Sequence, residues 1–179
     1  DLFDGPPSDY AKLVAPLADI KAPHGVYFTE GNHEEFQDPA PYLAAIREAG
    51  IKVLNKEMVV IDGMQILGIP YDNSNEPEEI RDSLAAIPFN PEKPSILLKH
   101  APSSARAVAV AGVSLMLSGH THNAQMWPYK FFVRRLFGKA SYGHSEINNL
   151  QTITSSGFGT WGPPQRFGTK AEVVVIKFS

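Results

Sequence analysis

The chain has 179 residues, 43% of them apolar and 20% charged, with a formal net charge of −3. This size and composition fit one globular domain with a sizeable core, and the small negative charge provides no global field that would favour nucleic acid. The chain has no cysteine, which excludes disulfides and thiolate metal sites, and no apolar run approaches the ~20 residues of a membrane span.

Helical and extended patterns alternate along the chain. In the first half they predict a helix at about 8–20 capped by Ser8, a strand at 26–29, a helix at 41–49 closed by Gly50, and strands at 58–61 and 64–69 joined by an Asp62-Gly63 turn. In the second half they predict a helix at 76–86, a strand at 95–98, a helix from Ser103 to about 111, a strand at 113–117, and late strands at 153–154 and 173–176. Residues 157–169 hold four Gly and two Pro, which indicates an ordered loop. The alternation predicts a layered α/β domain without an interdomain linker.

Four short polar motifs follow one another along the chain. They are Asp-Leu-Phe-Asp at 1–4, Gly-Asn-His-Glu at 31–34, Lys-His-Ala-Pro at 99–102 and Gly-His-Thr-His at 119–122. The last three each follow a predicted strand. Active sites of layered α/β folds collect at the carboxyl ends of strands, so we expect these motifs to meet in one site.

The residue types in these motifs are those that bind divalent cations. Such cations take carboxylate, amide oxygen and imidazole ligands. Two of them about 3.5–4 Å apart can share a carboxylate and a water, which attacks phosphorus while the metals neutralise the phosphoryl oxygens. His120 and His122 stand two residues apart, so in an extended or turn backbone each could serve a different metal.

Each motif also has an ordinary structural interpretation. His120 and His122 could be surface histidines, His100 a structural histidine at a strand end, Asn32-His33 a simple turn, and Asp1 and Asp4 loop acids. The joint arrangement favours a metal site, because four of the six histidines fall within the motifs.

With these motifs the chain resembles the calcineurin-like metallophosphoesterase family. The family's motifs are Asp-x-His, Gly-Asp-x-x-Asp, Gly-Asn-His-Asp/Glu, a lone His and Gly-His-x-His, and all but the first are found here in order. The stretches Gly-His-Thr-His-Asn-Ala-Gln at 119–125 and Gly-Phe-Gly-Thr-Trp-Gly-Pro-Pro at 157–164 are most similar to the bacterial membrane-associated branch. The resemblance implies an α/β/β/α sandwich of mixed sheets flanked by helices, formed by residues 1–179 as one N-terminally incomplete domain whose first strand is missing.

The resemblance also implies a role for individual residues. Its metal ligands would be Asp1 as the bridging carboxylate, Asn32, His100 and His120 on the second metal, and His122 on the first. The catalytic residues would be His33, near the leaving group as general acid or transition-state stabiliser, and Glu34, which would orient it. The implied cofactors are two divalent ions, and Mn, Fe and Zn all suit these ligands.

Two departures from the family pattern bear on this site. The Asp-x-His motif is absent, so we expect the first metal site to be incomplete and the second to bind its ion better. Asn123-Ala124 replaces the usual Gly-Gly after the last histidine, which we expect to tighten that loop.

Residues 127–139 combine aromatic and basic side chains. One interpretation is a loop or helix packed on the core with a solvated basic edge. The other is a patch that contacts an anionic membrane surface or a lipid-linked substrate, as basic amphipathic segments do. Trp161 between glycines could line the active site or belong to the core.

The leading hypothesis is a metal-dependent phosphoester hydrolase that uses a dinuclear centre and a metal-bridging hydroxide. Its substrate would be a phosphodiester, a pyrophosphate or a lipid-linked phosphate, either small or membrane-bound; nucleic acid is disfavoured by the net charge. The alternative is a catalytically inactive fragment or single-metal binding module that retains the fold. The localisation is left open, including a membrane anchor upstream of residue 1.

Overall fold

The computed structural model describes residues 1–2, 9–36 and 38–178. Its helices are α1 (Tyr10–Val14), α2 (Asn32–Glu35), α3 (Ala40–Glu48), α4 (Pro77–Ala85), α5 (Ala105–Val110) and α6 (Lys130–Phe137). Its strands are β1 (Tyr27–Phe28), β2 (Lys52–Val53), β3 (Glu57–Ile61), β4 (Met64–Ile69), β5 (Ser95–Lys99), β6 (Leu115–Ser118), β7 (Gly143–Ile147) and β8 (Leu150–Thr154). Short 3-10 turns occupy Ala15–Asp19, Tyr71–Asn73, His122–Ala124 and Gly138–Ser141.

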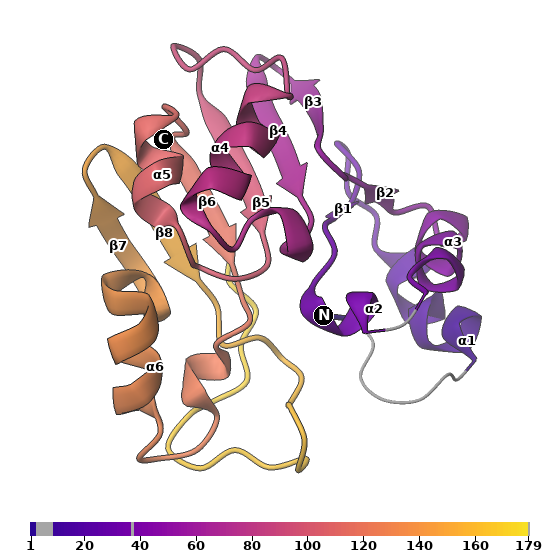
Figure 1. Ribbon diagram of the computed structural model, residues 1–179. Coiled ribbons are helices and arrows are strands. Elements are labelled where there is room, and N and C mark those ends of the chain that lie inside the picture. The colour runs from indigo at the N-terminus through magenta and orange to yellow at the C-terminus, as the bar shows by residue number, and fades with distance from the viewer. Residues whose placement is uncertain (3–8, 37, 179) are drawn as a thin grey trace.

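A mixed six-stranded sheet forms the centre of the fold, with strand order β3-β4-β5-β6-β8-β7. The four inner strands β4, β5, β6 and β8 run parallel, and the edge strands β3 and β7 are antiparallel to their neighbours. Figure 1 shows the arrowheads of the four parallel strands pointing to the same edge of the sheet. This sheet with its flanking helices confirms the predicted α/β class, and it brings the carboxyl ends of separate strands together.

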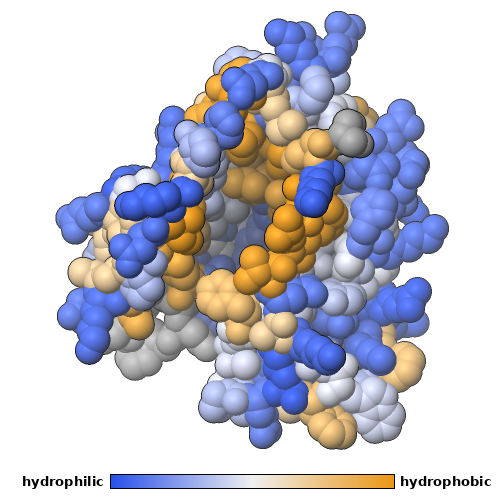
Figure 2. Space-filling model, turned by 180° about the vertical axis from the view of Figure 1, so that it is seen from behind, coloured by the Kyte–Doolittle hydropathy of each residue, from blue (hydrophilic) through white to orange (hydrophobic). Residues whose placement is uncertain are grey.

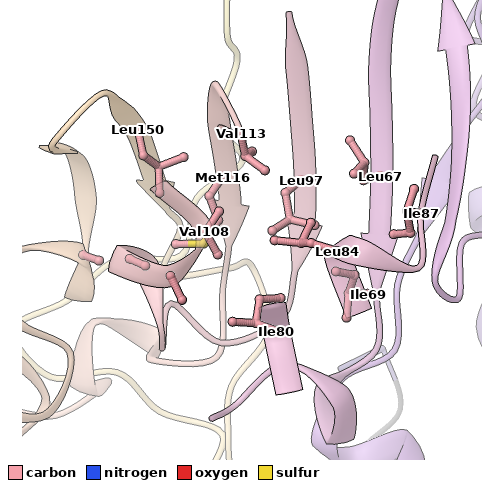
Figure 3. Packing of buried hydrophobic residues seen from close by; sticks show 13 residues of the cluster. Leu67, Ile69, Ile80, Leu84, Ile87, Leu97, Val108, Val113, Met116 and Leu150 are labelled. Carbon is pink, nitrogen blue, oxygen red and sulfur yellow. The ribbon is translucent and has the colours of Figure 1, made fainter. Parts of the chain in front are cut away.

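Helices α4 and α5 cover one face of this sheet. The buried cluster between them includes Ile80 and Leu84 from α4, Val108 from α5, and Leu97 and Met116 from the strands, and Figure 3 shows these side chains pointing into one layer. Full burial of each such side chain contributes about 1.5–3 kcal/mol relative to exposure. The cluster therefore fixes the strands whose ends carry the polar motifs.

The opposite face of the sheet is less well covered. The strand register places Ile66, Leu98, Leu117 and Ile153 on that face, and all four are only half-buried. Figure 2, which shows the molecule from behind, has a hollow at its centre with hydrophobic side chains along the rim.

A smaller unit packs around the two-stranded parallel sheet of β1 and β2. Helices α1 and α3 bury a second apolar cluster against it, which includes Val14, Leu43, Ile46 and Val53. This unit carries the loop after β1, and with it the Gly-Asn-His-Glu motif, to the edge where β5 and β6 end (Figure 1).

The predicted hairpin turn is confirmed. Asp62 and Gly63 join β3 to β4 with φ angles of 49° and 86°. Two successive positive φ values are the signature of the tight turn that matches the twist of paired strands, and Asp-Gly is well suited to it.

The start and the length of the first helix differ from the prediction. Ser8, the expected cap of the first helix, lies outside the described residues; the side chain of Asp9 accepts a hydrogen bond from the Lys12 backbone N–H instead. The α-helix gives way to a 3-10 turn at Ala15–Asp19, because Pro16 has no N–H to continue the α-helical ladder.

The prediction that Ser103 caps the next helix is wrong. Helix α5 begins after Ser104, whose φ is 55° and whose side chain makes no cap bond. The Ser104 hydroxyl donates instead to the Asn75 carbonyl, and the Ser103 hydroxyl accepts a bond from buried Lys99. Both hydroxyl groups thus bond to groups outside the helix and do not cap it.

The prediction of a strand at 173–176 is also wrong. This segment is irregular, and Val173, Val174 and Val175 are 79%, 42% and 81% exposed. An apolar β-branched run favours extended backbone, but a strand needs a hydrogen-bonding neighbour, and the described part of the chain offers none there. Conversely, the sequence pattern missed β7, because its alternating polar residues belong to an edge strand paired on one side only.

Candidate metal centre

Two strands end at the site and one helix begins there. His100 follows β5 directly, and His120 follows β6 after Gly119. Because β5 and β6 are parallel neighbours, the two histidines leave the sheet side by side. Asn32 opens α2 in the smaller unit, and Asp1 lies beside it at the start of the described chain.

The four polar side chains converge on one point, the Nε2 atom of His100. This atom lies 3.0 Å from Asp1 Oδ2, 3.1 Å from Asn32 Oδ1 and 3.0 Å from His120 Nδ1. The ligand atoms of Asp1, His100 and His120 all lie within 4.8 Å of one another. Neighbouring ligands of an octahedral ion with bonds of about 2.1 Å are separated by about 3.0 Å, so this donor set fits a divalent cation.

The protonation state of the His100 and His120 imidazoles also suits a cation. Burial lowers the pKa of His100 to about 2 and that of His120 to about 3. Both rings are therefore neutral at physiological pH and keep a lone pair on the unprotonated nitrogen. A neutral imidazole is the form that binds metal ions.

Gly31 permits the close approach on which the cluster depends. A Cβ atom at this position would lie 2.0 Å from Asp1 Oδ1 and 2.8 Å from His100 Nδ1. No side chain larger than hydrogen fits between these two groups. Steric crowding therefore requires glycine at the first position of the Gly-Asn-His-Glu motif.

Glu34 is fully buried and holds two backbone segments together. Its Oε1 accepts a hydrogen bond of 2.7 Å from the Leu2 N–H, and its Oε2 accepts one of 2.7 Å from the Gly31 N–H. These bonds fix the segments that carry Asp1 and Asn32, a function that the sequence did not indicate. The expected orientation of His33 by Glu34 stays a prediction.

His33 lies next to the carboxylate of Asp1. Its backbone N–H donates to Asp1 Oδ1 at 3.0 Å, and its Nε2 atom is 3.9 Å from Asp1 Oδ2. The side chain faces the two cavities that open onto the cluster. This position allows a proton to pass between the ring and a group bound in front of the metal ligands.

His122 is near the cluster without belonging to it. It lines both cavities together with Asp1 and His120. Its Nδ1 atom is buried and has no hydrogen-bond partner among the residues that the structure describes. An unpaired buried nitrogen of this kind is available to an ion. Asp4 lies outside the described residues.

The backbone of the 120–125 loop is unusual. His120, His122, Asn123 and Ala124 have φ angles of 65°, 48°, 49° and 65°. The left-handed conformation costs an L-residue other than glycine about 1–2 kcal/mol. The resemblance gave glycine as the usual residue at the positions of Asn123 and Ala124. Glycine suits both positions because it adopts positive φ without this cost.

Two cavities meet at the cluster. One, of about 330 Å³, lies between the metal ligands and the glycine-rich loop at 155–161. The other, of about 630 Å³, extends from the ligands toward α6. Trp161 lines both, so the aromatic residue between glycines belongs to the site rather than to the core.

Several residues at the site were not found from the sequence. The Tyr71 ring lies 5.8 Å from that of His100 and 5.6 Å from that of His120. Tyr71 follows β4 after Pro70, at another parallel strand end, and that placement could have indicated it.

Arg166 and Gln125 tie the glycine-rich loop to the metal loop. The Arg166 guanidinium donates to the carbonyl groups of His122, Ser156, Gly157 and Gly159. The buried Gln125 side chain exchanges two hydrogen bonds with the Trp161 backbone. No local sequence pattern indicates either residue, because both act between segments far apart in the chain.

An acidic group beside the site gives a pH-dependent prediction. Burial, with repulsion from Asp72, Glu30 and Glu34, raises the pKa of Glu35 from 4.5 to about 7, against the lowering effect of its bond from the Asp72 N–H. The folded pKa exceeds the unfolded value, so the carboxyl group's stabilising contribution is complete below about pH 4.5 and lost as the pH rises through about 7. Glu35→Gln, which keeps the acceptor oxygen, is therefore expected to raise the melting temperature at pH 8 more than at pH 5.

Thermal unfolding at the two pH values measures this difference. Glu78→Gln serves as the control, because the Glu78 side chain is 89% exposed and its ion pair with Arg81 is a surface contact of 3.9 Å. A Glu35→Gln gain that is the same at both pH values would contradict the prediction.

A mixed α/β sheet whose parallel strands end at a cluster of carboxylate, amide and imidazole donors defines a metal-binding protein of the layered α/β class. The chain belongs to the calcineurin-like phosphoesterase family, whose model matches residues 1–124. This confirms the resemblance at the level of the family. The family implies divalent metal ions, and Asp1, His100 and His120 form a partial site for them.

Curated relatives agree with this assignment. The chain is 32% identical to an uncharacterized metallophosphoesterase of Aquifex aeolicus, over 98% of this chain and 69% of that protein. It is 31% identical to one of Helicobacter pylori, over 99% of this chain and 49% of that protein, so it spans about half the length of that relative. A transmembrane protein with metallophosphoesterase domain from Bos taurus is 28% identical, over 98% of this chain and 44% of that protein. No solved structure matches the chain significantly.

Proposed function

We propose that the protein is a metal-dependent hydrolase of phosphoric esters with a dinuclear metal centre. The observation that carries the proposal is the convergence of carboxylate, amide and imidazole donors on His100 Nε2, at separations of 3.0–3.1 Å. The substrate would be a phosphodiester, a pyrophosphate or a lipid-linked phosphate.

In this proposal Asn32, His100 and His120 would hold the second metal, with Asp1 shared between the two metals and His122 on the first. Mn, Fe and Zn suit these ligands. When bound, the two cations would activate a water for attack on phosphorus and neutralise charge on the phosphoryl oxygens. Residues 1–179 contain no Asp-x-His, so among the proposed ligands the first metal would have only Asp1 and His122.

The chain's own residues would then position and protonate the substrate. The Asp1 carboxylate is held by the His33 backbone N–H, and the His33 ring beside it would donate a proton to the leaving oxygen. Glu34 would keep the loop that carries these groups in place through its bonds to Leu2 and Gly31.

One observation favours the second candidate, a catalytically inactive single-metal module. Among the residues that the structure describes, the cluster of possible metal ligands comprises Asp1, His100 and His120, enough for one ion with Asn32. This alternative retains the fold and the ion but lacks turnover.

The test is hydrolysis by the product of the full-length gene. After chelation, Mn²⁺, Fe²⁺ or Zn²⁺ is returned, and the protein is assayed on bis-p-nitrophenyl phosphate, p-nitrophenyl phosphate and a nucleotide pyrophosphate. The proposal expects activity that is lost on chelation and restored by metal, with about two ions bound per chain. A protein that binds one ion and hydrolyses none of these substrates would support the alternative.

We further propose that the protein belongs to a membrane-associated branch of the family and acts near an anionic membrane surface. Relatives named transmembrane proteins with metallophosphoesterase domain from Bos taurus and Danio rerio support this, as do the basic residues of α6. Within the described residues, no helix is long and apolar enough to cross a membrane. The basic residues of α6 would contact the anionic surface.

A further inference from the structure

The 630 Å³ cavity beside the metal ligands has two chemically different walls. One wall carries the polar groups Asp1, Asn32, His120 and His122. The rest of the lining includes an apolar set, here termed the apolar wall, which is formed by Phe36, Met126, Tyr129, Phe132, Leu136 and Trp161. A cavity of this size is typical of small-molecule sites, in which a few polar groups fix the ligand's orientation within an apolar lining.

The apolar wall comes largely from one face of α6. Tyr129, Phe132, Val133 and Leu136 follow the i, i+3, i+4, i+7 spacing that places residues on the same side of a helix, and all four line the cavity. Phe132 and Leu136 are nevertheless 65% and 77% exposed. In the part of the chain that the structure describes, this helix buries none of its residues completely.

The other face of α6 is basic and points elsewhere. Lys130, Phe131 and Arg134 line a separate cavity of about 590 Å³ together with Lys139 and His144. Figure 1 shows α6 beyond the start of β7, and its main contacts are with the 3-10 turns His122–Ala124 and Gly138–Ser141 rather than with the sheet. The helix is therefore not required to cover the core, and its apolar face is directed toward the metal ligands.

Large apolar side chains left in water are unfavourable by about 25 cal/mol for each Å² of apolar surface. Contiguous exposed apolar patches in soluble proteins are commonly binding sites. This patch is continuous with the cluster at which a phosphoryl group would bind, so its occupant would be joined to a phosphate.

We propose that the cavity seats the alkyl or acyl chain of an amphiphilic phosphoester whose phosphate lies at Asp1, His120 and His122. This inference rests on the proposed function and specifies its substrate class. Phe132 and Leu136 determine specificity by contacting the chain, while the phosphoryl group contacts only the polar wall.

Equilibrium binding of n-alkylphosphonates to the metal-loaded full-length protein tests the proposal without turnover. Octylphosphonate is expected to bind about 10–100-fold more tightly than butylphosphonate, because each buried methylene adds favourable transfer free energy. In Phe132→Ser/Leu136→Ser this ratio should fall to about threefold or less. Measurements are made below the critical micelle concentration.

Phe131→Ser is the matched control. Phe131 is 66% exposed, as Phe132 is, and lies on the same helix, but it lines the separate basic cavity. The control should keep the full octyl-to-butyl ratio and the wild-type rate on bis-p-nitrophenyl phosphate. Circular dichroism of all variants establishes that they are folded.

The outcomes separate this inference from the proposed function. A wild-type protein that hydrolyses bis-p-nitrophenyl phosphate but binds butyl- and octylphosphonate equally overturns the inference and leaves the proposed function standing. A chain-length preference without hydrolysis of any phosphoester contradicts the proposed function instead. Loss of a dimer in sedimentation of Phe132→Ser/Leu136→Ser, with the octyl-to-butyl ratio unchanged, assigns the patch to self-association and also overturns the inference.

Discussion

Replacing His100 by alanine is expected to reduce the affinity for the ion by more than ~100-fold and to remove phosphoesterase activity in proportion. The Nε2 atom of His100 lies 3.0–3.1 Å from ligand atoms of Asp1, Asn32 and His120. The substitution therefore removes the ligand atom at the centre of the cluster. Replacing residues that only support a metal ligand typically costs 10–100-fold, and loss of a ligand itself should cost more. Elemental analysis after dialysis against a metal buffer measures the change.

His24→Ala is the control for this experiment. His24 is also a histidine beside a carboxylate, 3.8 Å from Asp62, but its side chain is 61% exposed and lies outside the cluster. Its variant should bind the wild-type amount of metal. A His100→Ala protein that is folded and retains wild-type metal content would show that the cluster is not the ion site.

Replacing His33 by alanine is expected to lower turnover about 10²–10⁴-fold while metal content changes little. An acid catalyst typically contributes an effect of this size. The ring lies 3.9 Å from Asp1 Oδ2 and faces both cavities, yet it is not among the donors that surround His100 Nε2. Steady-state kinetics and elemental analysis on the same preparations separate the two effects.

The leaving group provides the sharper test of His33. An aryl phosphate has a good leaving group and needs little protonation, so its hydrolysis should suffer less in His33→Ala than that of an alkyl phosphate. Equal losses for the two substrates would count against the acid role. The same comparison of aryl and alkyl phosphates can test whether Glu34 orients His33.

The sequence predicted those parts of the fold that depend on local patterns. The hairpin at Asp62-Gly63 and the strand before His100 follow from turn chemistry and apolar runs, and both were found. The parallel arrangement of β5 and β6 then explains why His100 and His120 meet. The grouping of the polar motifs at strand ends was therefore predictable, whereas the ligand roles of these residues stay predictions.

The parts that could not be predicted depend on distant partners. Val173–Val175 have the composition of a strand but find no neighbour among the described residues, while polar β7 pairs with β8. Ser103 has the composition of a helix cap, but it accepts a hydrogen bond from Lys99. In each case the presence or absence of a tertiary partner outweighed the local preference.

The hydrogen bonds made by Arg166 and Gln125 couple the opening of the two loops around the site. The glycine-rich loop that carries Trp161 cannot swing away unless it breaks the hydrogen bonds that connect it to His122 through Arg166 and to Gln125. Segments joined in this way open as a single cooperative unit with one shared free energy. In the proposed two-metal site, admission of a ligand past Trp161 and release of the ion at His122 would thus be thermodynamically linked, and a change that loosens the entrance would also weaken retention of that ion.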